Sequence, residues 1–287
     1  MTKHHPENER IKRAYFTYLE EAKRMAPASV DQAAAAIAEF ERHTGHKDFR
    51  KFHIQQAKAF KAHLNAACNA ETGKLLAKAT IRSRLMALKA FIQWLASQPR
   101  YKSRISYPDA EYFNPSANDE RIATAHRSRP VPTLDDIRRV LAHMPSDTDL
   151  EKRNRALVAF AILSGARDDA IASLSIKHVD AAARTVFQDA REVRTKNRKT
   201  FTSWFFPVGD GIESIVVEWI GFLKVERQFG PDDPLFPATQ TALNTAGLFS
   251  AAGMSHAHWK DATAIRRIFK EASERAGLPS PLVVPQR

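Results

Sequence analysis

Residues 149–180 read DLEKRNRALVAFAILSGARDDAIASLSIKHVD, and this stretch decides the fold of the second half of the chain. Its first half predicts a helix from Asp149 to Ser164, because apolar residues recur at helical spacing along it. Gly165 predicts the helix end, since glycine tolerates the left-handed conformation best. Arg167 then follows on a turn, before a short helix and a strand that ends at Asp180.

The residues after this stretch indicate a small sheet and further helices. β-Branched and aromatic residues between 175 and 208 predict short strands, with the Lys-Asn-Arg-Lys run at 196–199 as a polar hairpin turn. Helical patterns return from Ile212 to Phe229 and from Trp259 to Ala276. The aromatic run Trp204, Phe205 and Phe206 is expected in the core, in preference to a base-stacking platform.

The first half is helical throughout. Between Glu7 and Gln98 the pattern predicts four helices, with breaks near Pro27, Thr44-Gly45 and Thr72-Gly73. The last helix carries one apolar stripe, formed by Ile81, Leu85, Leu88, Ile92 and Leu95.

A segment rich in proline and polar residues separates the two halves. Residues 114–132 hold prolines at 115, 130 and 132 and few large apolar side chains, which favours an interdomain linker. Thr133 followed by Asp136 then predicts the capped start of a new helix. We therefore expect a helical domain over residues 1–113, a linker over 114–132 and a second domain over 133–287.

The charge of the chain points to a polyanionic partner. Lys and Arg number 44 against 32 Asp and Glu, a formal charge of +12, and residues 50–110 hold twelve basic residues against two acidic ones, a local charge of +10. We interpret this segment as a surface for double-stranded DNA, the alternative being a solvated face. The predicted DNA-binding cations are Lys58, Lys61, Lys74, Lys78, Arg82, Arg84 and Lys89.

Composition argues against membranes, disulfides and metals. No apolar stretch approaches the length that spans a bilayer, and residues 1–24 are unlike a signal peptide. The single cysteine, Cys68, cannot form an internal disulfide and is expected to be buried or half-buried. His43, His46, His53 and His63 do not have metal-ligand spacing and are expected on the surface. We predict a cytoplasmic protein with neither cofactor nor metal.

The order of these features resembles the tyrosine recombinases of the phage integrase family. The resemblance rests on the turn Ser164-Gly165-Ala166-Arg167, the Leu174 to Asp180 segment, Thr195-Lys196, Phe206-Pro207-Val208 and Asp233-Pro234-Leu235-Phe236, preceded by a basic helical domain. It implies a mainly α fold with a small antiparallel β-sheet: an N-terminal helical core-binding (SAM-like) domain and an α+β integrase-type catalytic domain.

The resemblance also implies site residues and a reaction. In that family a tyrosine attacks a DNA phosphodiester to form a 3′-phosphotyrosine without metal or nucleotide. It places Arg167 among the arginines that stabilise the phosphate, and a hairpin lysine, Lys196 or Lys199, as the proton donor to the leaving oxygen. The alternatives are that Arg167 caps a helix or pairs with Asp168 or Asp169, and that the lysines form a solvated turn.

Three features depart from the family pattern. Ala170 stands where the family has an acidic residue, no tyrosine lies beyond Tyr112, and the one His-x-x-Arg match, His126 to Arg129, lies in the predicted linker. We therefore expect a recombinase truncated before the His-x-x-Arg box and the nucleophile, unable to cleave DNA alone. The alternatives are activity with a partner protomer, and a non-catalytic partner or inhibitor of intact recombinases.

Overall fold

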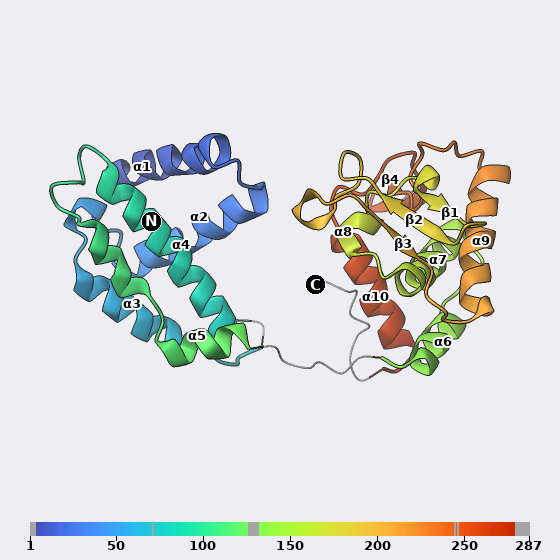
Figure 1. The fold of residues 1–287 in the computed structure, drawn as a ribbon, viewed down its shortest axis with the longest axis horizontal. Coiled ribbons are helices and arrows are strands. Elements are labelled where there is room, and N and C mark those ends of the chain that lie inside the picture. The colour runs from blue at the N-terminus through green and yellow to red at the C-terminus, as the bar shows by residue number, and fades with distance from the viewer. Residues whose placement is uncertain (1–3, 71, 126–131, 244, 246, 279–287) are drawn as a thin grey trace. The chain divides into compact units, whose positions relative to one another are not determined.

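The computed structural model describes residues 4–70, 72–125, 132–243, 245 and 247–278 in two compact units, Met1–Ser128 and Arg129–Arg287. Figure 1 shows the helices and strands of the two units, and each unit has its own hydrophobic core. The fold class is as predicted, because the chain is mainly helical with two small antiparallel sheets. None of the described helices is long and apolar enough to cross a membrane.

The first unit contains the four predicted helices. They are α1 (Pro6–Thr17, continued by a π-helical turn at Tyr18–Ala22), α2 (Pro27–His43), α3 (Ile54–Ala66) and α4 (Lys78–Ser97). Short 3-10 helices lie at Phe49–Lys51 and Tyr107–Phe113. All five residues of the predicted α4 stripe are at most 5% exposed, so the helical periodicity identified the packed face correctly.

A buried polar network joins α1 to the end of α2. The side chain of Asn8 is fully buried and donates to Glu41 Oε1 and to the Lys47 carbonyl, each at 3.0 Å. Asn8 Oδ1 in turn accepts the backbone N–H of Phe49 at 3.0 Å. Glu41 is also buried and pairs with Lys12 at 2.5 Å. These contacts satisfy polar groups that would otherwise be costly to bury.

Part of the segment between the halves is helical. Helix α5 (Ala117–Thr124) is capped by Ser116, whose hydroxyl accepts the N–H of Asp119 at 3.0 Å. It packs on α4 (Figure 1), so this part of the segment belongs to the first unit. The His126 to Arg129 match lies outside the described residues.

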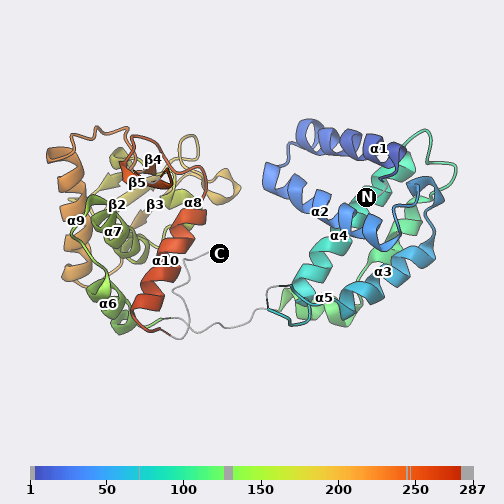
Figure 2. The same cartoon turned by 180° about the vertical axis from the view of Figure 1, so that it is seen from behind.

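Helix α7 (Asp149–Ser164) is the centre of the second unit and has the predicted bounds. It packs against α6 (Leu134–His143) and α9 (Asp210–Val225), and α10 (Thr263–Arg275) packs on α6 (Figure 2). Thr133 caps α6 as expected, because its hydroxyl accepts the N–H of Asp136 at 3.1 Å. Helix α10 begins four residues after Trp259, so the predicted start was too early.

Two antiparallel sheets complete the second unit. The first has the order β1-β2-β3, formed by Val179–Asp180, Thr185–Gln188 and Phe201–Trp204. The second pairs β4 (Thr239–Leu243) with β5 (Phe249–Met254), which the sequence patterns did not predict.

Two predictions of burial are wrong. Trp204 is 64% and Phe206 52% exposed, and Phe205 alone packs against the core. Trp204 lies on the solvent-facing side of the sheet, where Phe187 of the central strand β2 is also 45% exposed. Cys68 is exposed, because it lies in the loop between α3 and α4, where its backbone forms an isolated antiparallel β-bridge with exposed Leu75.

Candidate functional site

The turn that carries Arg167 is built by local capping. Helix α7 ends at Gly165, which has φ 62° and donates its N–H to the Ala161 carbonyl at 3.0 Å. The Ser164 hydroxyl donates to the Phe160 carbonyl at 2.7 Å and accepts the Ala166 N–H at 3.2 Å. Arg167 then takes an extended conformation directly before α8 (Asp168–Ile171). Hydrogen bonds from the N–H groups of Gly165 and Ala166 thus fix the backbone before Arg167.

The Arg167 side chain has a buried nitrogen without a partner. Its Nε is buried and makes no hydrogen bond within the part of the chain that the structure describes. The neighbouring acids are engaged elsewhere: Asp168 pairs with Arg266 at 2.6 Å and Asp169 with Arg194 at 2.9 Å. An unpaired guanidinium nitrogen is costly to bury, and an anion that accepts from it would remove that cost.

The end of β3 lies against this turn. The Phe206 N–H donates to the Leu163 carbonyl at 2.7 Å, which fixes the segment after β3 to the last turn of α7. A Cβ atom on Gly165 would fall 2.7 Å from Phe206 Cε2, closer than carbon atoms approach. Glycine is therefore favoured at 165 by its positive φ, and a Cβ there would also require the half-exposed Phe206 ring to shift.

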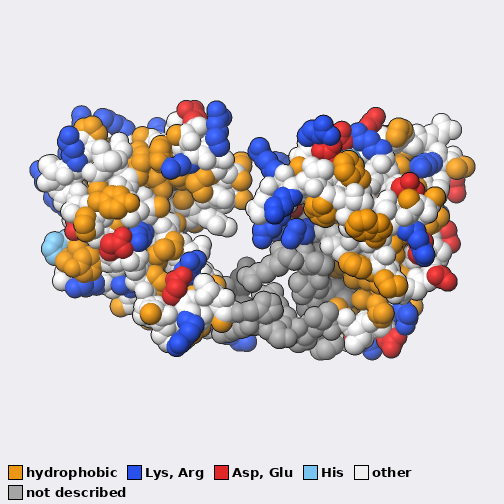
Figure 3. Space-filling model, viewed as in Figure 1, with side chains coloured by type: hydrophobic (Ala, Val, Ile, Leu, Met, Phe, Trp, Pro, Cys, Tyr) orange, Lys and Arg blue, Asp and Glu red, His pale blue; other side chains and the backbone are white. Residues whose placement is uncertain are grey.

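The connection between β2 and β3 carries unpaired cations. It contains a short 3-10 helix, Lys196–Arg198, in which Asn197 and Arg198 have φ of 60° and 50°. Lys196, Arg198 and Lys199 are exposed, and the described residues offer them no ion-pair partner. Lys and Arg side chains gather over this end of the second unit (Figure 3). Both predicted lysines therefore lie in the connection between the two strands, which is longer than the hairpin turn expected at 196–199.

Arg194 ties this connection to the Arg167 turn. Its backbone N–H donates to Ser173 Oγ at 2.9 Å, and its guanidinium contacts Asp169 at 2.9 Å and the Trp259 carbonyl at 3.0 Å. Motif analysis missed Arg194, because its contacts are 21 to 65 residues away in the sequence.

Solved structures of lambda integrase are similar to this chain in fold. No protein-family model matches the sequence, and no curated protein matches it. A lambda integrase (75–356) dimer bound to a COC′ core site matches with a TM-score of 0.60 and 11% identity, over 93% of this chain and 78% of that one. A lambda integrase tetramer bound to a Holliday junction matches with a TM-score of 0.58 and 12% identity, over 97% and 72%. The chain has the fold of the tyrosine recombinases. The sequence-based resemblance is thus confirmed at the level of the fold.

Within this integrase fold, most predicted DNA-binding cations of the first unit already have partners. The ion pairs are Lys78 with Asp119 (2.8 Å), Arg82 with Glu120 (2.6 Å), Arg84 with Glu39 (2.9 Å) and Lys89 with Glu111 (2.9 Å). Lys61 donates to the Asn114 carbonyl at 3.1 Å, and Lys58 lies 5.2 Å from the centre of the Tyr112 ring. The side chain of Lys74 is exposed and has no ion-pair partner among the described residues. Acids from outside residues 50–110 thus neutralise much of a surface that looked strongly basic in sequence.

His258 is a further polar group beside the Arg194 anchor. Its Nε2 lies 3.2 Å from Ser175 Oγ. Burial lowers its pKa below the ordinary value, and the nearby positive charge of Arg194 lowers it further.

The five tyrosines all lie in the first unit. Burial raises the pKa of Tyr15 to about 12 and also raises that of Tyr101, which is opposite to what an attacking phenolate requires. Tyr107 and Tyr112 are exposed, and Tyr18 packs beside Tyr15.

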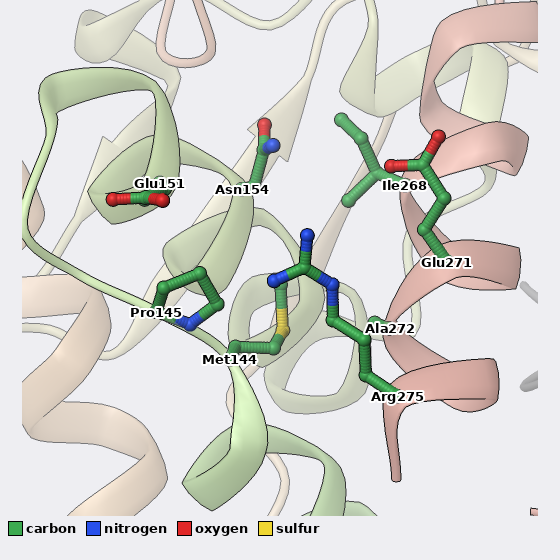
Figure 4. Close-up of a pocket in the computed structure, with 8 residues that line it drawn as sticks. All are labelled: Met144, Pro145, Glu151, Asn154, Ile268, Glu271, Ala272 and Arg275. Carbon is green, nitrogen blue, oxygen red and sulfur yellow. The ribbon is translucent and has the colours of Figure 1, made fainter. Parts of the chain in front are cut away.

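The described residues hold no group of three or more His, Cys, Asp or Glu side chains that is arranged to bind a metal. A small pocket of about 60 Å³ lies between the start of α7 and α10 and does not include Arg167 (Figure 4). It is lined by Met144, Pro145, Glu151, Asn154, Ile268, Glu271, Ala272 and Arg275.

Proposed function

We propose that this protein binds double-stranded DNA and directs Arg167 at a backbone phosphate. The observation that carries the proposal is the buried Arg167 Nε, which has no hydrogen-bond partner among the described residues, on a turn whose adjacent acids are both engaged elsewhere. A phosphate oxygen is the acceptor that such a guanidinium suits best, since the fork is planar and permanently charged. The fold supports this, because the integrases of similar structure are bound to a core site or to a Holliday junction.

The unpaired cations of the β2–β3 connection extend the same site. In this proposal either Lys196 or Lys199 approaches the phosphate and plays the part of the family's proton donor. In the same proposal the helical first unit, which includes α5, contacts the duplex, and residues 133–287 form the catalytic-type domain. The single cysteine makes a reducing cytoplasm the expected compartment.

We further propose that these 287 residues do not cleave DNA unaided. Transfer through a phosphotyrosine needs an activated phenolate, and burial raises the pKa of two of the five tyrosines, Tyr15 and Tyr101. Ala170 also replaces the acidic residue that the family places after the arginine.

A second candidate function is recombination together with other recombinase protomers that supply the nucleophile. Two of the similar structures favour it, because they are a dimer and a tetramer of lambda integrase on DNA.

The test is duplex binding by fluorescence anisotropy at about 50 and 200 mM salt. Arg167→Ala should weaken binding about tenfold or more, which is the loss expected for a charged hydrogen bond. Arg227→Ala is the matched control, because Arg227 is also a second-unit arginine but pairs with Asp149 at 2.6 Å. Equal affinities of Arg167→Ala and the parent protein would contradict the proposal.

A nicked duplex that traps covalent adducts tests cleavage. We expect no adduct with this chain alone. An adduct formed only when an intact recombinase is added would establish the second candidate function.

A further inference from the structure

The outer face of the three-stranded sheet carries two exposed aromatic rings. Val186 and Gln188 of β2 are buried, so Phe187 between them points to the opposite face, where it is 45% exposed. Residues paired across two antiparallel strands share a face, and the pairs are Thr185 with Trp204 and Phe187 with Thr202. Phe187 and Trp204 therefore lie diagonally on one solvent-facing surface, within the reach of large side chains.

Neither ring is covered by another described aromatic side chain or cation. Trp204 is 64% exposed, which is unusual for so large an apolar residue on a strand. Phe206, 52% exposed, continues the apolar surface to the Gly165 turn that carries Arg167. The aromatic face thus adjoins the proposed phosphate site.

Unpaired positive charge lies at one end of this face. The connection with Lys196, Arg198 and Lys199 joins the end of β2, next to Phe187, to the start of β3. Aromatic faces beside free cations are the chemistry that binds unpaired nucleotides, since the bases stack on the rings and the cations contact the phosphates. In an intact duplex the bases are already stacked on one another, so their faces cannot stack on the aromatic rings of the protein.

The second sheet also carries exposed apolar side chains, but it lacks charged groups beside them. Phe249 on β5 is 78% and Leu243 on β4 63% exposed, but residues 239–254 contain no charged side chain. That hairpin offers apolar surface without any group for a phosphate.

We propose that the face formed by Phe187 and Trp204, with the cations of the β2–β3 connection, binds unpaired nucleotides of a DNA strand. This deepens the proposed DNA-binding function, because it predicts a preference for DNA with exposed bases beside a duplex. The ligand class is single-stranded DNA of any sequence, since every base has a face that stacks.

Tryptophan fluorescence of the full chain tests this directly. Trp219 and Trp259 are buried and Trp94 packs against Tyr15, Tyr18 and Phe91, so Trp204 is the tryptophan that a base can reach. Titration with a twelve-nucleotide oligothymidylate should quench the Trp204 emission. Trp204→Ala should abolish that quenching and weaken oligothymidylate binding, measured by anisotropy, at least fivefold.

Two variants make the test specific. Trp204→Phe keeps a stacking ring and should retain affinity within about threefold of the parent protein, by the same stacking argument. Phe249→Ala removes an even more exposed ring from the uncharged hairpin and should leave oligothymidylate binding unchanged. Trp204 is mostly exposed, so its replacement should leave the unfolding transitions in place.

The outcomes separate this inference from the proposed function. If Trp204→Ala binds oligothymidylate as tightly as the parent, the inference is overturned, whatever the duplex result. If duplex binding is absent while oligothymidylate binding depends on Trp204, the duplex proposal fails and the inference stands. If Trp204→Ala changes only self-association, the face is an interface with a second copy and the inference is wrong.

Discussion

The ring of Phe206 occupies the place where any side chain on Gly165 would have to sit, with Cε2 2.7 Å from the position of a Cβ atom. The contact joins the exit of β3 to the C-terminal turn of α7, two residues before Arg167. The Phe206 N–H bond to the Leu163 carbonyl strengthens the same junction. The position of the Arg167 backbone is therefore set by packing across two distant segments as well as by local capping.

Replacement of Gly165 should disturb this junction. Gly165→Ala places a Cβ at φ 62° and against Phe206, so the second unit should lose about 2–4 kcal/mol of unfolding free energy. Urea denaturation measures the loss. Gly211→Ala is the control, because Gly211 lies in α9 with open space around it and should be neutral or slightly stabilising. Similar losses in both variants would contradict the role of Phe206, and addition of Phe206→Ala should recover part of the Gly165→Ala loss.

Removal of the buried Asn8 side chain should destabilise the first unit. Asn8→Ala leaves the Phe49 N–H, the Lys47 carbonyl and Glu41 with a missing partner in a buried site. The expected loss is about 2–5 kcal/mol, seen as a lower urea midpoint for that unit. The transition of the second unit should not move. A change below about 0.5 kcal/mol, the usual range for surface positions, would show that Asn8 contributes little.

Loss of an acid on α5 should strengthen duplex binding. Glu120→Gln frees Arg82, which pairs with it at 2.6 Å, and so makes one more cation available to phosphates. Affinity should rise about two- to fivefold, and the slope of log affinity against log salt should steepen by about one. Glu20→Gln changes the net charge equally but lies on the π-helical turn, away from that ion pair. Equal effects of the two substitutions would mean that net charge, and not the release of Arg82, governs binding.

The second unit should lose stability in mild acid through His258. Its pKa is lowered in the folded protein, so between the ordinary value near 6.5 and the folded pKa the unfolded chain binds more protons. The His258 contribution is therefore complete above pH 6.5 and decreases as pH falls through that window. His258→Gln should reduce the difference in urea midpoint between pH 7.5 and 5.5. His143→Gln, at an exposed ring on α6, should leave that difference as it is in the parent protein.

Local rules predicted the helices well. The bounds of α7, the Thr133 cap, the Gly165 helix end and the α4 stripe were all correct, because each depends on residues within one or two helical turns. The β4–β5 hairpin was missed, because neither strand alternates apolar and polar residues and both are mostly exposed. The helical start assigned to Trp259 was wrong, since that ring packs in the core ahead of α10.

The sequence alone determined the helices apart from α5, the glycine-arginine turn and the cationic segment between β2 and β3, since these follow from short-range periodicity, capping and composition. Only the tertiary structure decided which charges are free. Arg82 meets Glu120 38 residues away and Asp168 meets Arg266 98 residues away, whereas Arg167 Nε and the connection cations have no described partner. It likewise decided that Trp204 is exposed, because the exposure of a strand residue depends on how the strands pair and on which face of the sheet other elements cover. Charge pairing and exposure are properties of distant segments brought together, and local patterns do not contain them.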